Sequence, residues 1–140
     1  MKTFRRLTLL ILFIVALAGC ATLEDVRVEN RESLENLNLG MTKDQAQQVM
    51  GTKTIRTYDA GYATPRSIIN QPFRSEGFDI DDHFCEVLYY YTDLKAKDGA
   101  ITDDELTPLV FVDNELIGWG RTFLDEAVAK HESDQQKEMN

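Results

Sequence analysis

A basic start, residues 1–6, is followed by an almost uninterrupted apolar run, Leu7–Ala18. A membrane-spanning helix needs about 20 apolar residues, so this run is too short to span and has the length found in signal peptides. It ends in Leu17-Ala18-Gly19-Cys20, an aliphatic and two small residues before a cysteine. The pattern predicts a bacterial lipobox, with residues 1–19 as signal peptide and Cys20 as the lipidated residue. An ordinary signal peptide and a short anchor are the alternatives.

After the lipobox, the apolar positions up to Gly51 have the spacing of helices. Residues 20–30 are polar and acidic and predict a lipidated tether, which leads into a first helix within Asn30–Leu39. Thr42-Lys43-Asp44-Gln45 has the sequence of a capping box, in which the first and last side chains bond each other's backbone N–H groups. Gly51 follows the apolar positions of this second helix, where a left-handed cap is favoured.

The later part of the chain alternates with the period of β-strands. Lys53–Tyr58 predicts a weak strand, and Phe84–Thr92 a strong one that is apolar on both faces, as in a central or doubly covered strand. Leu109–Val112 and Leu116–Arg121 flank Asp113-Asn114, two residues that tolerate the left-handed backbone of a tight hairpin.

Between the first two strands, Asp59–Asp82 is long and contains prolines, glycines and several large apolar residues, among them Tyr62, Ile68, Ile69, Phe73 and Phe78. It is expected to be a loop, either packed over its own sheet or docking a partner. Pro108 is placed at a strand start, where a missing N–H costs least. A final helix at about Phe123–Lys130 is expected to lead into a charged tail, residues 132–140.

Two helices followed by an antiparallel sheet predict an α+β fold over residues 31–131. We expect the two N-terminal helices to pack on one face of a small antiparallel sheet, with a short C-terminal helix.

Charge narrows the range of partners. The chain of 140 residues has a net charge of −9, and residues 1–19 hold three basic residues and no acid, so the mature chain is more acidic still. Such a surface repels nucleic acid and anionic lipid headgroups, and we expect no nucleic-acid partner. With Cys20 lipidated, Cys85 has no internal disulfide partner. A small buried residue is its favoured role over a nucleophile or an intermolecular bridge.

One acidic segment resembles half of a calcium-binding loop. Residues 98–106 place Asp98, Asp103 and Glu105 around a glycine as in an EF-hand, but Leu94 and Ala96 stand where two further carboxylates are needed. A solvated acidic turn is the preferred interpretation, and a cation site of Asp98, Asp103 and Glu105 is the alternative.

Catalytic patterns are sparse. His83 and Cys85 lie two residues apart on one face of a predicted strand, without an evident third group to orient them. No metalloprotease or serine-hydrolase motif is present, and we expect neither an enzyme nor a cofactor. Trp119 lies between Gly118 and Gly120, which suggests close backbone approach. Its side chain is expected in the core or, alternatively, as a surface anchor.

Three stretches carry a resemblance: Asn30-Arg31, Leu37–Gly51 and, most specifically, Glu86–Gly120. They resemble a family of small uncharacterised bacterial lipoproteins. The leading helix pair is also similar to the SmpA/OmlA (BamE-like) outer-membrane lipoproteins and, more loosely, to the fold of β-lactamase-inhibitor protein. The resemblance implies this fold and a cell-envelope setting, and it implies no catalytic residues.

Together these features predict an outer-membrane-anchored, periplasm-facing lipoprotein that acts as a non-catalytic interaction module in envelope assembly or maintenance. In enterobacterial systems an aspartate after the lipidated cysteine retains lipoproteins in the inner membrane, so Ala21 favours the outer membrane by analogy. The expected partners are the membrane, through the lipid, and an envelope protein. Phe73, Arg74 and Trp119 are the candidate binding residues. The alternative function is a ligand- or cation-binding lipoprotein that uses the Asp98–Glu105 loop.

Overall fold

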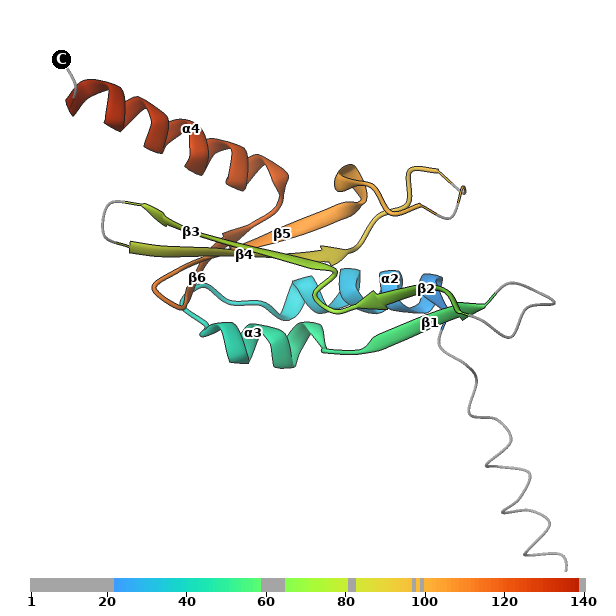
Figure 1. The fold of residues 1–140 in the computed structure, drawn as a ribbon. Coiled ribbons are helices and arrows are strands. Elements are labelled where there is room, and N and C mark those ends of the chain that lie inside the picture. The colour runs from blue at the N-terminus through green and yellow to red at the C-terminus, as the bar shows by residue number, and fades with distance from the viewer. Residues whose placement is uncertain (1–21, 59–64, 81–82, 97, 99, 139–140) are drawn as a thin grey trace, which may run out of the picture.

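The computed structural model describes residues 22–58, 65–80, 83–96, 98 and 100–138 (Figure 1). Its helices are α2 (Leu23–Ser33), α3 (Lys43–Met50) and α4 (Arg121–Glu138), with short 3-10 helices η1 (Leu34–Asn36) and η2 (Asp103–Glu105). Its strands are β1 (Thr54–Tyr58), β2 (Pro65–Asn70), β3 (Arg74–Ile80), β4 (His83–Tyr91), β5 (Leu106–Val112) and β6 (Glu115–Trp119). The fold is α+β, as predicted from the sequence.

The strands form two antiparallel sheets. One pairs β1 with β2, and the other has the order β3-β4-β5-β6, so β4 and β5 are its central strands. Helices α2 and α3 lie on one side of the larger sheet and α4 on the other (Figure 1).

The larger sheet separates two apolar clusters. The cluster on the α3 side consists of Leu37, Ala46, Met50, Leu88, Tyr90, Leu109, Phe111 and Leu116. The cluster on the α4 side consists of Val87, Tyr89, Tyr91, Leu106, Val110 and Leu124. Successive residues of β4 contribute to opposite clusters because side chains of a strand alternate between faces. The predicted two-faced central strand is thereby confirmed.

The N-terminal helix begins earlier than predicted. The Thr22 hydroxyl accepts a hydrogen bond from the Asp25 N–H, and the Asp25 carboxylate accepts one from the Thr22 N–H. The predicted tether over residues 20–30 is therefore wrong from residue 22 onward. Val26 and Asn30 of α2 are buried against the rest of the domain. A capping box closed by aspartate departs from the usual glutamate or glutamine pattern, so the sequence pattern missed it.

Residues 30–51 contain two helices predicted from the sequence. The helix predicted within Asn30–Leu39 is confirmed over residues 30–36, which belong to α2 and η1, and is wrong beyond them, because Leu37 has extended backbone. The capping box of α3 is confirmed: Thr42 and Gln45 bond each other's backbone N–H groups. Gly51 has the predicted positive φ, +88°, although its ψ of 164° lies outside the left-handed helical region.

The long loop predicted over Asp59–Asp82 is also wrong, since β2 and β3 both lie within it. Residues 59–64 and 81–82 of that segment are outside the described residues. Gly77 lies inside β3, where the Phe84 ring covers it; a Cβ atom there would come within 3.0 Å of the ring. The glycine that suggested a loop is thus explained by close packing within a strand.

The hairpin between β5 and β6 is confirmed: Asp113 and Asn114 have φ values of +48° and +70°. Pro108, however, is the third residue of β5 and not its first. Its carbonyl accepts a hydrogen bond of 2.8 Å from the Gly120 N–H. Its nitrogen therefore faces the β6 side, beyond the last paired residue of β6, and no ladder hydrogen bond is lost.

Helix α4 extends to Glu138, well past the predicted end at Lys130, so the region predicted as a charged tail is mostly helical. Residues 130–138 contain no apolar side chain, which left apolar periodicity without a signal there. No helix in the described part of the chain has both the length and the apolar content that a membrane span requires.

Candidate functional site

Helix α4 is fastened to the sheet by its first turns. The Phe123 ring lies over Gly118 of β6, where a Cβ atom would come within 2.5 Å of the ring. Leu124 is buried in the cluster on this face. The glycine at 118 is therefore explained by the close approach of a side chain and not by the predicted backbone approach. Farther along, the helix stands off the β3–β4 pair (Figure 1).

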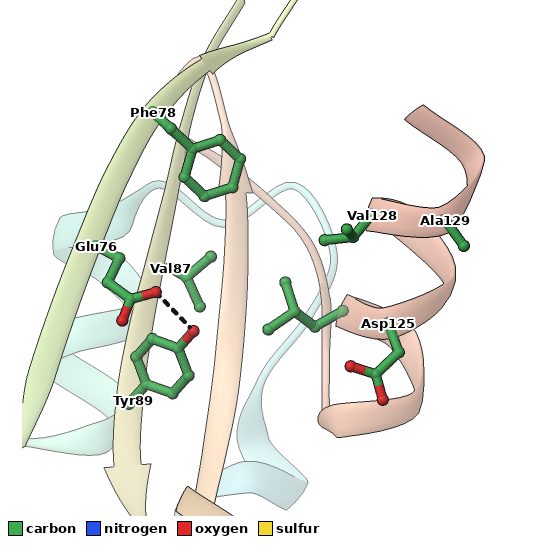
Figure 2. Close-up of a pocket in the computed structure, with 8 residues that line it drawn as sticks. Glu76, Phe78, Val87, Tyr89, Asp125, Val128 and Ala129 are labelled. Carbon is green, nitrogen blue, oxygen red and sulfur yellow. Dashed lines mark hydrogen bonds between the residues drawn. The ribbon is translucent and has the colours of Figure 1, made fainter. Parts of the chain in front are cut away.

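A groove of about 340 Å³ opens between α4 and the β3–β4 pair (Figure 2). We call it the α4 groove; it is lined by Glu76, Phe78, Val87, Tyr89, Leu124, Asp125, Val128 and Ala129. Phe78 and Val128 face it from opposite walls and are 38 % and 41 % exposed. The lining contains two acidic residues, Glu76 and Asp125, and no basic residue. The lining therefore combines apolar side chains with two acidic ones.

One end of the α4 groove is closed by a polar cluster. The Tyr89 hydroxyl donates a hydrogen bond of 3.0 Å to Glu76, and the Arg74 guanidinium lies 4.2 Å from the centre of the Tyr89 ring. Arg74 also pairs with Glu76 at 3.1 Å and with Asp103 at 3.0 Å. Arg121 donates to the Asp103 carbonyl at 2.6 Å, which ties α4 to η2. Burial raises the pKa of Tyr89, and the hydrogen bond to Glu76 raises it further.

The structure does not bring the three predicted binding residues together. Arg74 lies at the end of the α4 groove, on the face of Tyr89. Trp119 packs against the cluster on the opposite face of the sheet, which agrees with the preferred core position. Phe73 is partly exposed beside β3, and its N–H donates to the Tyr89 carbonyl.

The acidic loop is organised by hydrogen bonds. Glu105 is buried, and its carboxylate accepts N–H groups of Lys95, Ala96 and Thr102 at 2.6, 3.4 and 3.0 Å. The backbone hydrogen bond from Lys95 is the main cause that holds the pKa of Glu105 below its ordinary value.

The predicted cation ligands are not gathered into a site. Asp98 accepts a hydrogen bond from the Ala100 N–H, Asp103 pairs with Arg74, and Glu105 is occupied by backbone N–H groups. Among the described residues, no cluster of three His, Cys, Asp or Glu side chains could hold a metal ion. The carboxylates thus have structural partners and the half EF-hand pattern does not form a loop of that kind.

His83 and Cys85 differ in burial. Cys85 is buried, as favoured from the sequence, and burial raises the pKa of its thiol, which disfavours the reactive thiolate. His83 is exposed, and its Nδ1 lies 2.5 Å from the Asp113 carboxylate at the β5–β6 hairpin. That contact lowers the pKa of Asp113.

Residues 16–126 match DUF3192, a family of proteins of unknown function. The chain belongs to this family. Its match begins before Cys20 and ends within α4, so the DUF3192 region includes the lipobox pattern and the first turns of the helix. No curated protein and no solved structure matches the chain.

Two features of this DUF3192 chain were missed from the sequence. One is the α4 groove, whose walls come from segments about fifty residues apart. The other is a buried amide pair: the Gln71 side chain donates to Asn30, and Asn30 donates to the Tyr91 carbonyl, each at 2.8 Å. A lone asparagine and glutamine carry no sequence signal for this pairing. Cys20 and Ala21 lie outside the described residues.

Proposed function

We propose that this protein is a lipid-anchored, periplasm-facing component of the outer membrane, whose domain serves as a non-catalytic protein-interaction module in envelope assembly or maintenance. The observation that carries the interaction role is the α4 groove, where Phe78 and Val128 stay exposed although they face each other. Exposed apolar side chains that gather on a concave surface favour a binding site over an ordinary surface.

The polar groups at the groove support binding more than catalysis. Arg74 is paired with Glu76 and Asp103, so its charge is already compensated. Tyr89 is protonated at neutral pH, since the ordinary pKa of tyrosine, 10.0, already lies well above it and burial raises the pKa further. A general base or an activated nucleophile would need a group poised near neutral pH.

The lipobox and the capped helix together support direct attachment to the membrane. Cys20 lies two residues before Thr22, which caps α2. A lipid on Cys20 would therefore hold the domain close to the bilayer and not on a long tether. The start of α2 and the end of β3 lie at opposite ends of the molecule, so the open end of the α4 groove would point away from the membrane (Figure 1).

The anchor is tested by fractionation of cells that express the full chain. Replacing Cys20 by alanine should release the protein from membranes, because a thioether to lipid requires the thiol. Ala21→Asp should keep the protein lipidated but move it to the inner-membrane fraction. A Cys20→Ala protein that stays in the membrane fraction would refute the anchor.

The interaction role is tested by photo-crosslinking in intact cells. A photoreactive residue at position 78 should trap a discrete adduct. Position 117 is the matched control, because Phe78 and Ile117 lie on opposite edge strands of one sheet and are each 38 % exposed. Equal adducts from both positions, or none from 78 in a folded protein, would contradict a binding role for the groove.

A further inference from the structure

The outer edge of β3 carries backbone groups suited to pairing. β3 is an end strand of the four-stranded sheet. The Phe84 carbonyl accepts the Asp113 N–H, so even-numbered residues of β4 turn their backbone groups toward β5. By the alternation of antiparallel strands and the register of β3 with β4, the N–H and C=O groups of Ser75, Gly77 and Asp79 turn outward.

Exposed aromatic rings flank this edge on both faces of the sheet. Phe78 lies on the face of the α4 groove. Phe84 is 50 % exposed and covers Gly77 on the opposite face. An added strand would point alternate side chains to the two faces, and could therefore contact both rings.

Charge indicates what kind of strand would fit. Glu76 and Asp79 lie on β3, and Asp125 lies across the groove on α4. Glu76 is partly compensated by Arg74, whereas the chain as a whole has a net charge of −9. Cationic side chains on the incoming strand would thus be attracted to this edge.

We propose that β3 accepts an extended segment of a partner protein as an additional strand, and that this segment alternates cationic and apolar residues. Main-chain hydrogen bonds to the β3 edge supply affinity. Because the segment alternates, its apolar residues all lie on one face of the sheet, where they contact Phe78, and its cationic residues lie on the other, where they meet the Phe84 ring. The inference rests on the proposed interaction role and specifies its partner. A second copy of this chain fits less well, because pairing would bring two acidic edges together.

The test titrates the intact lipidated protein, purified in detergent, with a fluorescent peptide of alternating lysine and valine about nine residues long. We expect saturable binding that weakens as NaCl rises, since salt screens exposed charges. A peptide of alternating glutamate and valine should not bind. Hydrogen exchange at Ser75, Gly77 and Asp79 should slow on binding of the lysine peptide.

Matched variants locate the site. Phe78→Lys should weaken binding of the lysine peptide about tenfold or more, because it removes an apolar contact and adds a like charge. Ile117→Lys makes the same change of charge on the other edge strand and should alter affinity less than about twofold. Asp125→Lys replaces an acidic by a basic side chain at an exposed position of α4, so it tests the effect of charge on peptide affinity without removing an apolar contact. Circular dichroism checks that each variant is folded.

Three results would overturn the proposal. One is equal binding of a lysine–valine peptide with methylated backbone nitrogens, which cannot donate the ladder hydrogen bonds. The second is equal loss of binding in Phe78→Lys and Ile117→Lys. The third is a concentration-dependent dimer that Phe78→Lys dissociates, which would assign the edge to a second copy. If the peptides fail while position 78 still crosslinks a protein in cells, only the strand-addition inference fails.

Discussion

Glu105 illustrates how one buried carboxylate organises the connection between β4 and β5. Its three N–H donors come from both ends of the connection, so the carboxylate holds the loop closed. Hydrogen bonds from the backbone compensate a charge that would otherwise be costly to bury.

Glu105→Ala should lower the free energy of unfolding by about 2–3 kcal/mol, because it leaves buried donors unpaired. Glu105→Gln should cost less, since its one carbonyl oxygen still accepts. The folded-state pKa of Glu105 is lowered from 4.5, so its stabilisation is present above that pH and is lost as pH falls through the folded value. Urea unfolding between neutral and acid pH measures both effects. An identical acid dependence in wild type and Glu105→Gln would contradict this role.

Tyr90 presents the opposite case, a buried polar atom without compensation. Its side chain is fully buried, its hydroxyl has no hydrogen-bond partner among the described residues, and burial raises its pKa to about 12. Tyr90→Phe should leave the free energy of unfolding at pH 7 unchanged or raise it by up to about 1 kcal/mol.

The same substitution should change the alkaline response. The folded pKa of Tyr90 lies above its ordinary value of 10.0, so the unfolded chain loses this proton at lower pH than the folded protein does. The free energy of unfolding is therefore unaffected by this group below pH 10 and falls as pH rises through about 12. Tyr90→Phe should therefore unfold at higher pH than wild type. Tyr89→Phe serves as the contrast, since it removes a hydrogen bond to Glu76 and should destabilise by about 1 kcal/mol. Fluorescence-detected unfolding measures both variants. If Tyr90→Phe lowers the free energy of unfolding as much as Tyr89→Phe does, the Tyr90 hydroxyl is not unpaired as described.

At the scale of elements, one glycine sets the position of α4. Gly118 leaves room for the Phe123 ring, which holds the first turn of the helix on β6. Gly118→Ala should destabilise by about 2 kcal/mol or more, because a Cβ atom would overlap the ring. In a Phe123→Ala background the same change should cost much less, and denaturant unfolding of the double-mutant cycle measures this coupling. Additive losses would mean that the two residues do not share this space.

At the scale of the whole molecule, stability should be unevenly distributed. β4 and β5 are paired on both sides and covered on both faces, whereas β1 and β2 form a separate two-stranded sheet. The connection after β2 is held by the Asn30–Gln71 pair. Native-state hydrogen exchange should therefore be slowest in β4 and β5 and faster in β1 and β2. Asn30→Ala should accelerate exchange in β1 and β2 most; uniform acceleration would contradict a separate unit.

Elements with a strong local signal were predictable. The capping box of α3, the two-faced strand β4 and the hairpin at Asp113 and Asn114 depend on nearby residues and were placed correctly. The misplaced elements depend on distant partners. β3 is a strand because β4 lies beside it and Phe84 covers Gly77, neither of which is visible in its own sequence.

Some residues of the candidate site could be selected from the sequence and others could not. Arg74 was selected from the sequence, but Phe78 and Val128 were not, because their importance arises from an α4 that diverges from the sheet. Trp119, the one tryptophan of the sequence, packs against the core, which was its preferred predicted position.

The sequence by itself determined the α+β class, the acidic charge, the capped helix α3 and the lipobox pattern, because each follows from composition or from residues a few positions apart. Only the tertiary structure decided that α2 starts at Leu23 with Thr22 as its cap, that backbone N–H groups from both sides of a loop bind the Glu105 carboxylate, and that a groove and an edge strand lie beside α4. Those features depend on backbone and side chains brought together from distant segments, and short-range sequence patterns carry no record of such distances.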